Sequence, residues 1–142
     1  MANATIQQEF DIPAEQLWEL IGDFGNMSKW TGLPPETCIQ EGEGIGCIRT
    51  LTVPRGTIID RLDALTANSY SYTVINAPES PLPYSAYSAS MTVDAVTPMS
   101  SRLTWAGKFA PDGISEEEAV TNAENMYKMG IGMMKATIAG VQ

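Results

Sequence analysis

The amino-acid sequence predicts an α+β fold in which a curved seven-stranded antiparallel sheet wraps around one long C-terminal helix. Three observations support this prediction. Between residues 36 and 110, apolar and polar residues largely alternate, which is typical of half-buried strands. The connections between these runs are short and rich in turn-forming residues, which favours antiparallel neighbours over parallel crossovers. After Ser115 the apolar spacing becomes helical, and such a helix must bury its apolar face against the sheet.

The N-terminal segment predicts one strand and two short helices. Residues 4–10 (ATIQQEF) alternate as a strand does. In the following PAEQLWELIGDFG, Pro13 suits the first turn of a helix. Four residues then form an apolar stripe at helical spacing: Leu17, Trp18, Leu20 and Ile21. Residues 25–35 (GNMSKWTGLPP) predict a short helical turn and a loop, because glycine and the proline pair prevent a longer helix.

Six further strands are expected before the long helix. They cover residues 36–42, 46–53, 57–65, 69–76, 84–96 and 101–110. Each contains β-branched or aromatic residues, and turn signals such as GEGIG, TAN and TPMS separate several of them. With residues 4–10 they make seven strands. We expect a single domain, 1–142, because this length suits one core or one cavity.

The C-terminal helix has a clear start and an unusual middle. Ser115 and Glu118 form a capping box, and the acidic first turn suits the helix dipole. The stretch NMYKMGIGMMK sets four methionines around Gly130 and Gly132. Each glycine costs about 0.5–1 kcal/mol relative to alanine, which suggests that space is needed beside the helix or that it bends.

Methionine suits a wall that adapts to ligands of different shape. We therefore expect Met126, Gly130 and Met133 to line a cavity. The alternative is a plain helical stripe that packs on the sheet, and one face of the helix can serve both purposes.

Composition and charge exclude several classes of function. The formal net charge is −9, which disfavours binding to nucleic acid or to anionic membrane surfaces. No apolar run is long enough to span a membrane, so integral membrane association is not expected. The N-terminal residues MANATIQQEFDIP lack both the basic start and the apolar stretch of a secretion signal. These features predict a cytoplasmic protein.

The chain has no histidine and two cysteines. The absence of histidine excludes His-based zinc sites and catalytic triads. We expect neither a metal nor another cofactor. Cys38 and Cys47 lie close enough in the chain for a disulfide across a hairpin, but two buried free thiols are the favoured interpretation in the cytoplasm.

The order of these elements resembles the START-like (SRPBCC) superfamily, the helix-grip proteins that include the birch-pollen-allergen type. Within it the chain is most similar to the polyketide cyclase/dehydrase and lipid-transport group. The resemblance covers nearly the whole chain and rests on the segments PAEQLWELIGDFGNMSKW, EGEGIGCIRTL, IIDRLDAL and LTWAGKFAP. It implies a helix-grip fold with a ligand cavity between the sheet and the C-terminal helix. The fold hosts carriers, receptors and enzymes, so it does not fix the function.

The resemblance also implies which residues line the cavity. The acidic residue before Arg-Leu, here Asp60, points inward, and the tyrosines of the next strands, here Tyr72 and Tyr87, line the wall. The chain departs from some hormone-receptor relatives, because Thr31 or its neighbours stand where those relatives have a lysine. This departure argues against a receptor for a carboxylate ligand.

The segment GIGCIRTLTVPRGTIIDRLDAL predicts a hairpin with Arg49 on one arm and Asp60 on the other. An even loop sets Arg49 opposite Asp60. A three-residue loop with a bulge at Gly56 would set it opposite Arg61 instead. The resemblance favours the first register. The pair would then either orient a polar group of a ligand or form an internal salt bridge that only fixes the register.

The aromatic residues offer further candidates. Tyr70 and Tyr72 share one face of their strand, whereas simple alternation places Tyr84 and Tyr87 on opposite faces. Phenol groups can donate hydrogen bonds to a flat ligand or stack on it, although strands favour tyrosine for other reasons too. We expect Trp30 at the far end of the cavity. The direction of Trp105 is left open.

Two functions compete. The first is a binding protein that carries or sequesters a small, mostly hydrophobic ligand, aromatic or polyketide-like, as a monomer or homodimer. Its ligand-binding candidates are Trp30, Arg49, Asp60, Tyr72, Tyr87, Met126, Gly130 and Met133. The second is a metal-independent enzyme of the cyclase/dehydrase or isomerase type, with Asp60 and Tyr87 as the acid/base pair. An ion pair with Arg49 would weaken Asp60 as a base and so counts against the enzyme.

Overall fold

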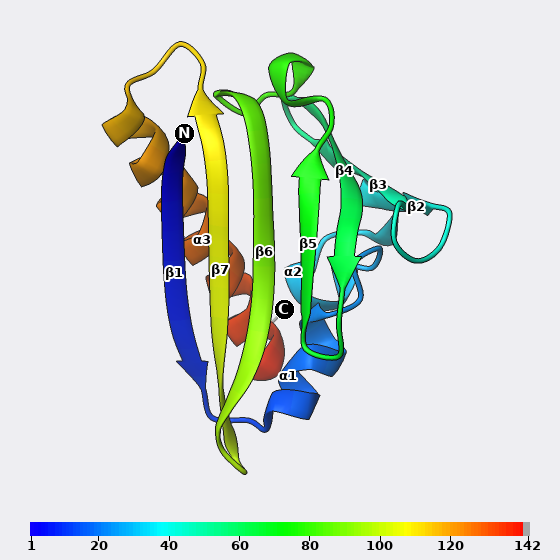
Figure 1. The fold of residues 1–142 in the computed structure, drawn as a ribbon. Coiled ribbons are helices and arrows are strands. Elements are labelled where there is room, and N and C mark those ends of the chain that lie inside the picture. Colours follow the sequence, from blue (N-terminus) through cyan, green and yellow to red (C-terminus); the bar gives the residue numbers. More distant parts are fainter. Residues whose placement is uncertain (141–142) are drawn as a thin grey trace.

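The computed structural model describes residues 1–140 and confirms the predicted fold class. Seven strands form one antiparallel sheet in the order β1-β7-β6-β5-β4-β3-β2 (Figure 1). Their bounds are Ala2–Phe10, Cys38–Glu41, Ile48–Val53, Gly56–Leu65, Ser69–Val74, Tyr84–Thr97 and Ser100–Pro111 for β1 to β7. Strands β2 to β7 form the predicted meander, and β1 adds to it by pairing with β7.

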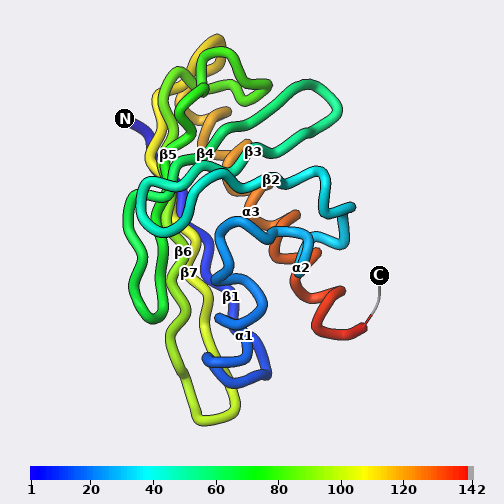
Figure 2. Tube along the Cα trace, turned by 90° about the vertical axis from the view of Figure 1, so that its right-hand side faces the viewer, coloured from blue at the N-terminus to red at the C-terminus, as the bar shows by residue number. Residues whose placement is uncertain are grey.

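Helix α3 (Glu116–Ile138) lies along one face of the sheet, while the short helices α1 (Ala14–Ile21) and α2 (Ser28–Thr31) follow β1. Two short 3-10 turns, η1 (Pro35–Thr37) and η2 (Ala77–Glu79), complete the chain. Seen from the side, strands β2 to β4 curl over toward the side on which α3 lies (Figure 2). The curvature gives the sheet a concave face, and α3 packs against it.

The predicted capping box starts α3. The backbone N–H of Glu118 donates to Ser115 Oγ at 3.1 Å, and the N–H of Ser115 donates to Glu118 Oε1 at 3.3 Å. These bonds satisfy two backbone donors that would otherwise lack partners at the helix start. The helix therefore begins at a defined residue, which fixes where its methionines lie along the sheet.

The hairpin of β3 and β4 adopts the even register. Val53 pairs with Gly56, and Arg49 lies directly opposite Asp60. The alternative pairing is wrong, because Arg61 lies opposite Ile48 and points to the exposed side of the sheet. The register places both members of the charged pair on the concave face.

The prediction that Tyr84 and Tyr87 lie on opposite faces of the sheet was wrong. Both side chains are buried, and their rings stack with centroids 5.3 Å apart. The register between β6 and β7 shifts between Tyr84 and Ala86. Such an irregularity inserts one extra residue, so two residues at odd spacing reach the same face.

The described residues bear on the cysteines, on membrane crossing and on metal ligands. Cys38 and Cys47 are free thiols, but only Cys47 is fully buried. Within residues 1–140 no helix combines the length and the apolar character that a membrane crossing needs. The same residues hold no group of three or more potential metal ligands among Cys, Asp and Glu.

Candidate functional site

Two adjacent chambers lie between the concave face of the sheet and α3. The inner chamber has a volume of about 160 Å³, and the residues that line it include Trp30, Arg49, Asp60, Tyr72, Tyr87 and Tyr127. The outer chamber has a volume of about 210 Å³, and Leu33, Val53, Met129, Gly130 and Met133 contribute to its wall. Trp30, Trp105 and Met126 border both chambers.

The structure thus brings together all the residues that the sequence selected for ligand binding. Five of them line the inner chamber, one from α2 and four from strands: Trp30, Arg49, Asp60, Tyr72 and Tyr87. Met126, Gly130 and Met133 of α3 line the outer chamber. Trp30 does not lie at the far end of the cavity but between its two parts. It is held there because α2 packs on α3 and the carbonyl oxygen of Trp30 accepts a hydrogen bond from Thr137 Oγ1. Their role in binding stays a prediction.

Arg49 is a buried cation held from several sides. Its Nε donates to Asp60 Oδ2 at 2.7 Å, and Nη1 donates to the carbonyl oxygen of Phe24 at 2.9 Å. The guanidinium carbon lies 4.1 Å from the ring centroid of Phe24 and 4.8 Å from that of Tyr72. Burial works against its charge, but Asp60, together with smaller contributions from Tyr70 and Tyr72, raises the pKa of Arg49 overall. Arg49 is therefore a fixed positive charge in an aromatic enclosure.

Asp60 has one carboxylate oxygen engaged and one that is unpartnered. The residue is only 1% exposed, and within residues 1–140 its Oδ1 has no hydrogen-bond partner. Burial raises the pKa of Asp60, while the charge of Arg49 opposes the rise. A buried acceptor without a donor is costly, and native structures contain few of them. Oδ1 is thus the strongest acceptor that the inner chamber offers to a ligand.

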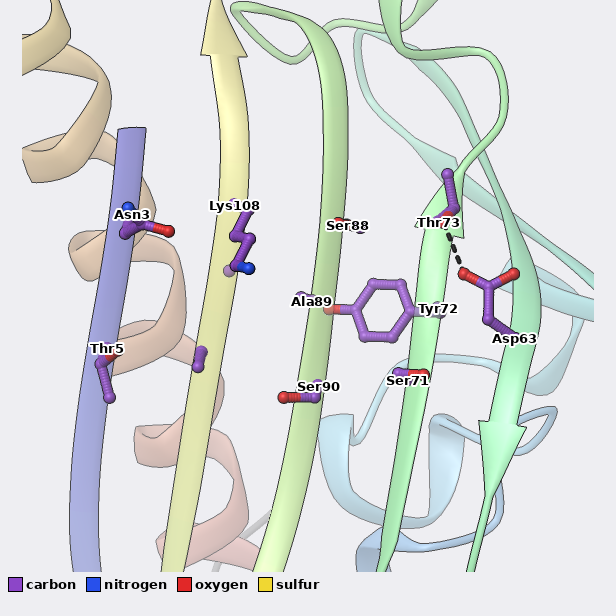
Figure 3. A pocket seen from close by; sticks show the side chains of 12 residues that line it. Asn3, Thr5, Asp63, Ser71, Tyr72, Thr73, Ser88, Ala89, Ser90 and Lys108 are labelled. Atoms are coloured by element: carbon purple, nitrogen blue, oxygen red, sulfur yellow. Dashed lines mark hydrogen bonds between the residues drawn. The ribbon is translucent and has the colours of Figure 1, made fainter. Parts of the chain in front are cut away.

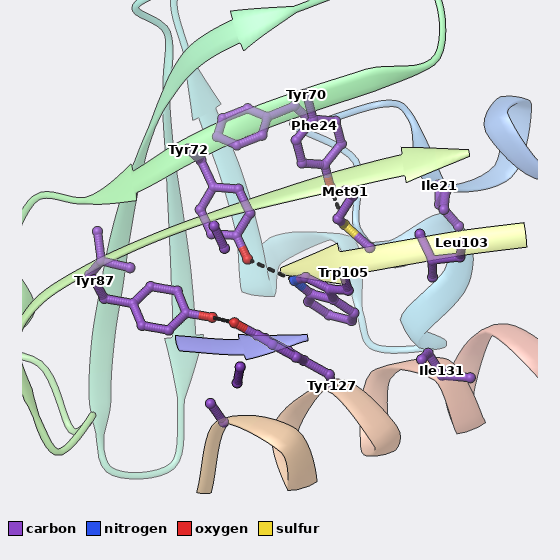
Figure 4. Packing of buried hydrophobic residues seen from close by; sticks show 14 of the residues in the cluster. Ile21, Phe24, Tyr70, Tyr72, Tyr87, Met91, Leu103, Trp105, Tyr127 and Ile131 are labelled. Atoms are coloured by element: carbon purple, nitrogen blue, oxygen red, sulfur yellow. Dashed lines mark hydrogen bonds between the residues drawn. The ribbon is translucent and has the colours of Figure 1, made fainter. Parts of the chain in front are cut away.

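A cluster of aromatic side chains forms the rest of the inner wall (Figure 4). Trp105 Nε1 donates to the hydroxyl of Tyr72 at 3.3 Å, and the hydroxyls of Tyr87 and Tyr127 share a hydrogen bond. The rings of Trp105 and Tyr127 stack with centroids 4.6 Å apart. Burial raises the pKa of Tyr127 to about 12 and raises those of Tyr72 and Tyr87 as well. These phenols are neutral at physiological pH and act as hydrogen-bond donors or acceptors.

Sequence reasoning missed Tyr127 as a site residue, although a signal was present. Gly107 lies in the middle of β7, and a Cβ atom there would collide with the Tyr127 hydroxyl. A glycine inside a strand often marks the close approach of another group. Phe24, which encloses Arg49, lies in a loop without any periodic pattern, so no comparable signal existed for it.

The two glycines of α3 have different surroundings. A Cβ atom on Gly130 would lie 2.8 Å from the Trp105 ring and 3.5 Å from the Trp30 ring. Much of the space that the missing side chain leaves is therefore taken by tryptophan. Gly132 is exposed, and a Cβ atom on it would have no neighbour within 4 Å. Of the two glycines, only Gly130 makes room for neighbouring side chains.

A larger hollow lies on the opposite face of the sheet (Figure 3). It has a volume of about 560 Å³ and is lined by short polar side chains such as Thr5, Ser88 and Ser90, with Lys108 at one side. All four of these side chains are at least partly exposed, and a hydrogen bond from Thr73 already engages Asp63. Among the described residues, the buried side-chain atoms without a hydrogen-bond partner belong to Trp30 and Asp60, and neither residue lines this hollow. The two interior chambers are therefore the better candidate site.

The comparisons with known proteins agree with this fold. The chain matches the family described as polyketide cyclase/dehydrase and lipid transport over residues 1–139. It is 30% identical to an uncharacterized protein from Bacillus thuringiensis, with a TM-score of 0.79 over 94% of this chain and 96% of that one. The protein XoxI from Bacillus cereus is 29% identical, with a TM-score of 0.81 over 97% of this chain and 96% of that one.

A more distant structure shows the same fold. The Zhui aromatase/cyclase from Streptomyces sp. R1128 is 16% identical, with a TM-score of 0.68 over 97% of this chain and 92% of that one. At this identity the likeness concerns the fold alone. A search of curated proteins gave no match. Because the family match extends over nearly the whole sequence, the chain belongs to the polyketide cyclase/dehydrase and lipid-transport family.

Proposed function

We propose that this protein carries or sequesters a small, mostly hydrophobic ligand, aromatic or polyketide-like, in the two interior chambers. The observation that supports the proposal is an apolar, aromatic cavity whose wall holds a few buried polar atoms. Such a combination is typical of small-molecule sites. Together the chambers reach only the lower end of the ~300–1,000 Å³ that such sites usually have. The ligand is accordingly small.

Apolar burial would supply most of the affinity. A ligand that buries about 200 Å² of apolar surface gains roughly 5 kcal/mol at about 25 cal/mol per Å². Part of this gain is offset by the lost freedom of the ligand. The polar atoms then orient the ligand rather than hold it alone. A cytoplasmic location and a monomeric or homodimeric state, expected from the sequence, stay predictions.

One observation favours a second candidate, a cyclase/dehydrase-type enzyme. Among the described residues, Oδ1 of Asp60 has no hydrogen-bond partner, and Asp60 lines the same chamber as Tyr87. The carboxylate could remove a proton next to a carbonyl while a neutral tyrosine donates to the developing enolate. The bond of 2.7 Å from Arg49 to the other oxygen weakens the base, however, and we therefore rank binding first.

Native mass spectrometry of the freshly purified protein tests the proposal. We expect a retained molecule that leaves on mild activation and whose mass identifies its class. The proposal would be contradicted if the protein retains no molecule and also binds no member of a panel of small aromatic compounds.

Turnover separates the two candidates. For an enzyme, Asp60→Asn and Tyr87→Phe would abolish turnover of a polyketide-like substrate while the protein still binds it. For a carrier, no turnover occurs in the parent protein, and both variants change affinity only. Melting temperatures of both variants show whether they are folded.

A further inference from the structure

The two chambers differ in the hydrogen-bonding groups that they offer. In the inner chamber, Asp60 Oδ1 lacks a donor, and Trp30 Nε1, at the border of both chambers, lacks an acceptor within residues 1–140. Asp60 is 1% exposed and Trp30 is 2% exposed, so bulk water does not reach either residue. Unpaired groups of this kind are rare in native structures, and both point to a ligand that supplies the missing partners.

The tyrosines add a further donor to the inner chamber. Tyr72 accepts the hydrogen bond of Trp105 Nε1 and makes no other side-chain hydrogen bond among the described residues. Its own hydroxyl hydrogen is therefore available. Tyr87 and Tyr127 have two hydroxyl hydrogens between them but share one hydrogen bond. The inner chamber thus offers one strong acceptor and several donors within aromatic walls.

Three of the polar side chains that line the outer chamber already have partners nearby. Thr31 Oγ1 accepts from the N–H of Leu33, and Thr37 Oγ1 donates to the carbonyl oxygen of Pro34. Cys38 Sγ donates to the carbonyl oxygen of Gly25. The remaining wall is largely apolar and includes Met126, Met129 and Met133. The outer chamber therefore favours an apolar group.

Exposure shows which chamber opens to solvent. Leu33 is 48% exposed and Met129 is 66% exposed, and both border the outer chamber. The residues that line the inner chamber are all buried or partly buried, and Trp30 and Trp105, whose rings meet edge to face at 6.2 Å, border both chambers. A ligand that enters past Leu33 and Met129 reaches the polar atoms last.

We propose that the ligand is an amphiphile that binds head first. A flat ring that carries both a hydrogen-bond donor and an acceptor occupies the inner chamber, where Asp60 Oδ1 and Trp30 Nε1 meet it. An apolar tail lies in the outer chamber along the methionines of α3. The inference rests on the proposed function, because it assumes that the chambers bind a ligand. It goes beyond that function by stating the chemistry of the ligand and its direction.

Two probes of similar size test this orientation. The first is 5-pentylresorcinol, whose ring hydroxyls both donate and accept. The second is 1,3-difluoro-5-pentylbenzene, which keeps the shape but has no donor and only weak acceptors. The test changes the probe opposite Asp60 rather than the residue, because a neutral side chain there would leave Arg49 buried without its counter-charge and would mix a loss of stability into the affinity. Calorimetry gives the affinities, and we expect the resorcinol to bind at least tenfold more tightly.

Tryptophan variants provide the matched control. Trp30→Phe removes an N–H that has no partner, whereas Trp18→Phe makes the same change at a ring that packs on Tyr70 and borders neither chamber. We expect Trp30→Phe to weaken the resorcinol about fivefold or more and to leave the difluoro probe unchanged. Trp18→Phe should change neither affinity.

The three indole N–H signals of 15N-labelled protein report the position of the head directly. The signal lost in Trp30→Phe identifies Trp30, and we expect it to shift with the resorcinol but not with the difluoro probe. Equal affinities for the two probes with an unmoved Trp30 signal would overturn the head-first orientation while the binding function stands. If neither probe binds, the binding function fails as well.

Discussion

The inner and outer chambers share the same pair of tryptophans, but their walls are held in different ways. In the inner chamber the wall groups bond to one another: Arg49 to Asp60, Trp105 to Tyr72, and Tyr87 to Tyr127. In the outer chamber the wall consists mainly of methionines and of loop residues that bond to their own neighbours. A network of mutual bonds fixes geometry, whereas methionine adapts. The comparison indicates that the inner chamber recognises the polar groups of a ligand, whereas the outer chamber tolerates apolar groups of different shape.

Alkaline pH should disrupt the inner wall before it affects the outer one. Burial raises the pKa of all five tyrosines, to about 12 for Tyr84 and Tyr127. An unfolded chain releases these protons near pH 10. The stabilisation is therefore complete below pH 10 and is lost as the pH rises from about 10 toward 12. For Tyr84 and Tyr127, two pKa units correspond to about 2.7 kcal/mol each, and the raised pKa values of the other three tyrosines add to the loss. The combined loss is comparable to the stability of many domains.

Tyrosinate absorbance and circular dichroism, followed together from pH 8 to pH 13, check this prediction. We expect the tyrosines to ionise in the same narrow pH range in which the fold is lost. A titration of two or more tyrosines near pH 10 in a folded protein would show that the inner wall is open to solvent.

Arg49→Met tests the charged pair and should cause the largest effect of any single substitution. It leaves the Asp60 carboxylate buried without a counter-charge, which costs about 3–5 kcal/mol of unfolding free energy. The double variant Arg49→Met/Asp60→Leu should recover most of this loss, because an apolar pair of similar volume avoids the desolvation of both charges. Urea denaturation measures all three proteins.

The matched control for this pair is Arg61→Met on the outer side of β4, the strand that carries Asp60. Arg61 Nε lies 2.8 Å from Asp63 Oδ1, but the two side chains are 48% and 31% exposed. Exposed pairs contribute about 1 kcal/mol or less. Equal losses for Arg49→Met and Arg61→Met would mean that the interior pair does not support the inner chamber.

These residues also show how far sequence reasoning reaches. The fold could be predicted from strand alternation. The pairing of Arg49 with Asp60 could be predicted as one of two registers, and the family resemblance favoured it over the bulged alternative. That Tyr84 shares the buried face with Tyr87 could not be predicted, because a shift of register interrupts the alternation. The size of the cavity depends on how the rings of Trp30 and Trp105 fill the space beside Gly130, and no periodic pattern encodes that packing.

Gly130→Ala tests the border between the chambers. The new methyl group would lie 2.8 Å from the Trp105 ring, so the ring must shift. Overpacking of this kind costs about 1–3 kcal/mol, and the better helix propensity of alanine offsets about 0.5–1 kcal/mol. We expect a net loss of about 1–2 kcal/mol in urea denaturation.

Gly132→Ala makes the same change two residues further along α3. This position is exposed, and the methyl group meets no neighbour within 4 Å. The variant should therefore gain about 0.5–1 kcal/mol from helix propensity alone. If both variants gain stability, then Trp105 can move away at little cost, and the border between the chambers is loosely packed.

The smallest effect is expected at the methionines, where the outer wall can be compared with the core. Met133 is partly exposed and borders the outer chamber, whereas Met134 is fully buried and borders neither chamber. Volume-conserving substitutions usually cost less than about 1.5 kcal/mol, and the cost arises where neighbours cannot adjust. Met133→Leu should therefore change the urea midpoint less than Met134→Leu does. The reverse order would show that the outer wall is packed as tightly as the core, and the division between a rigid chamber and an adaptable one would no longer hold.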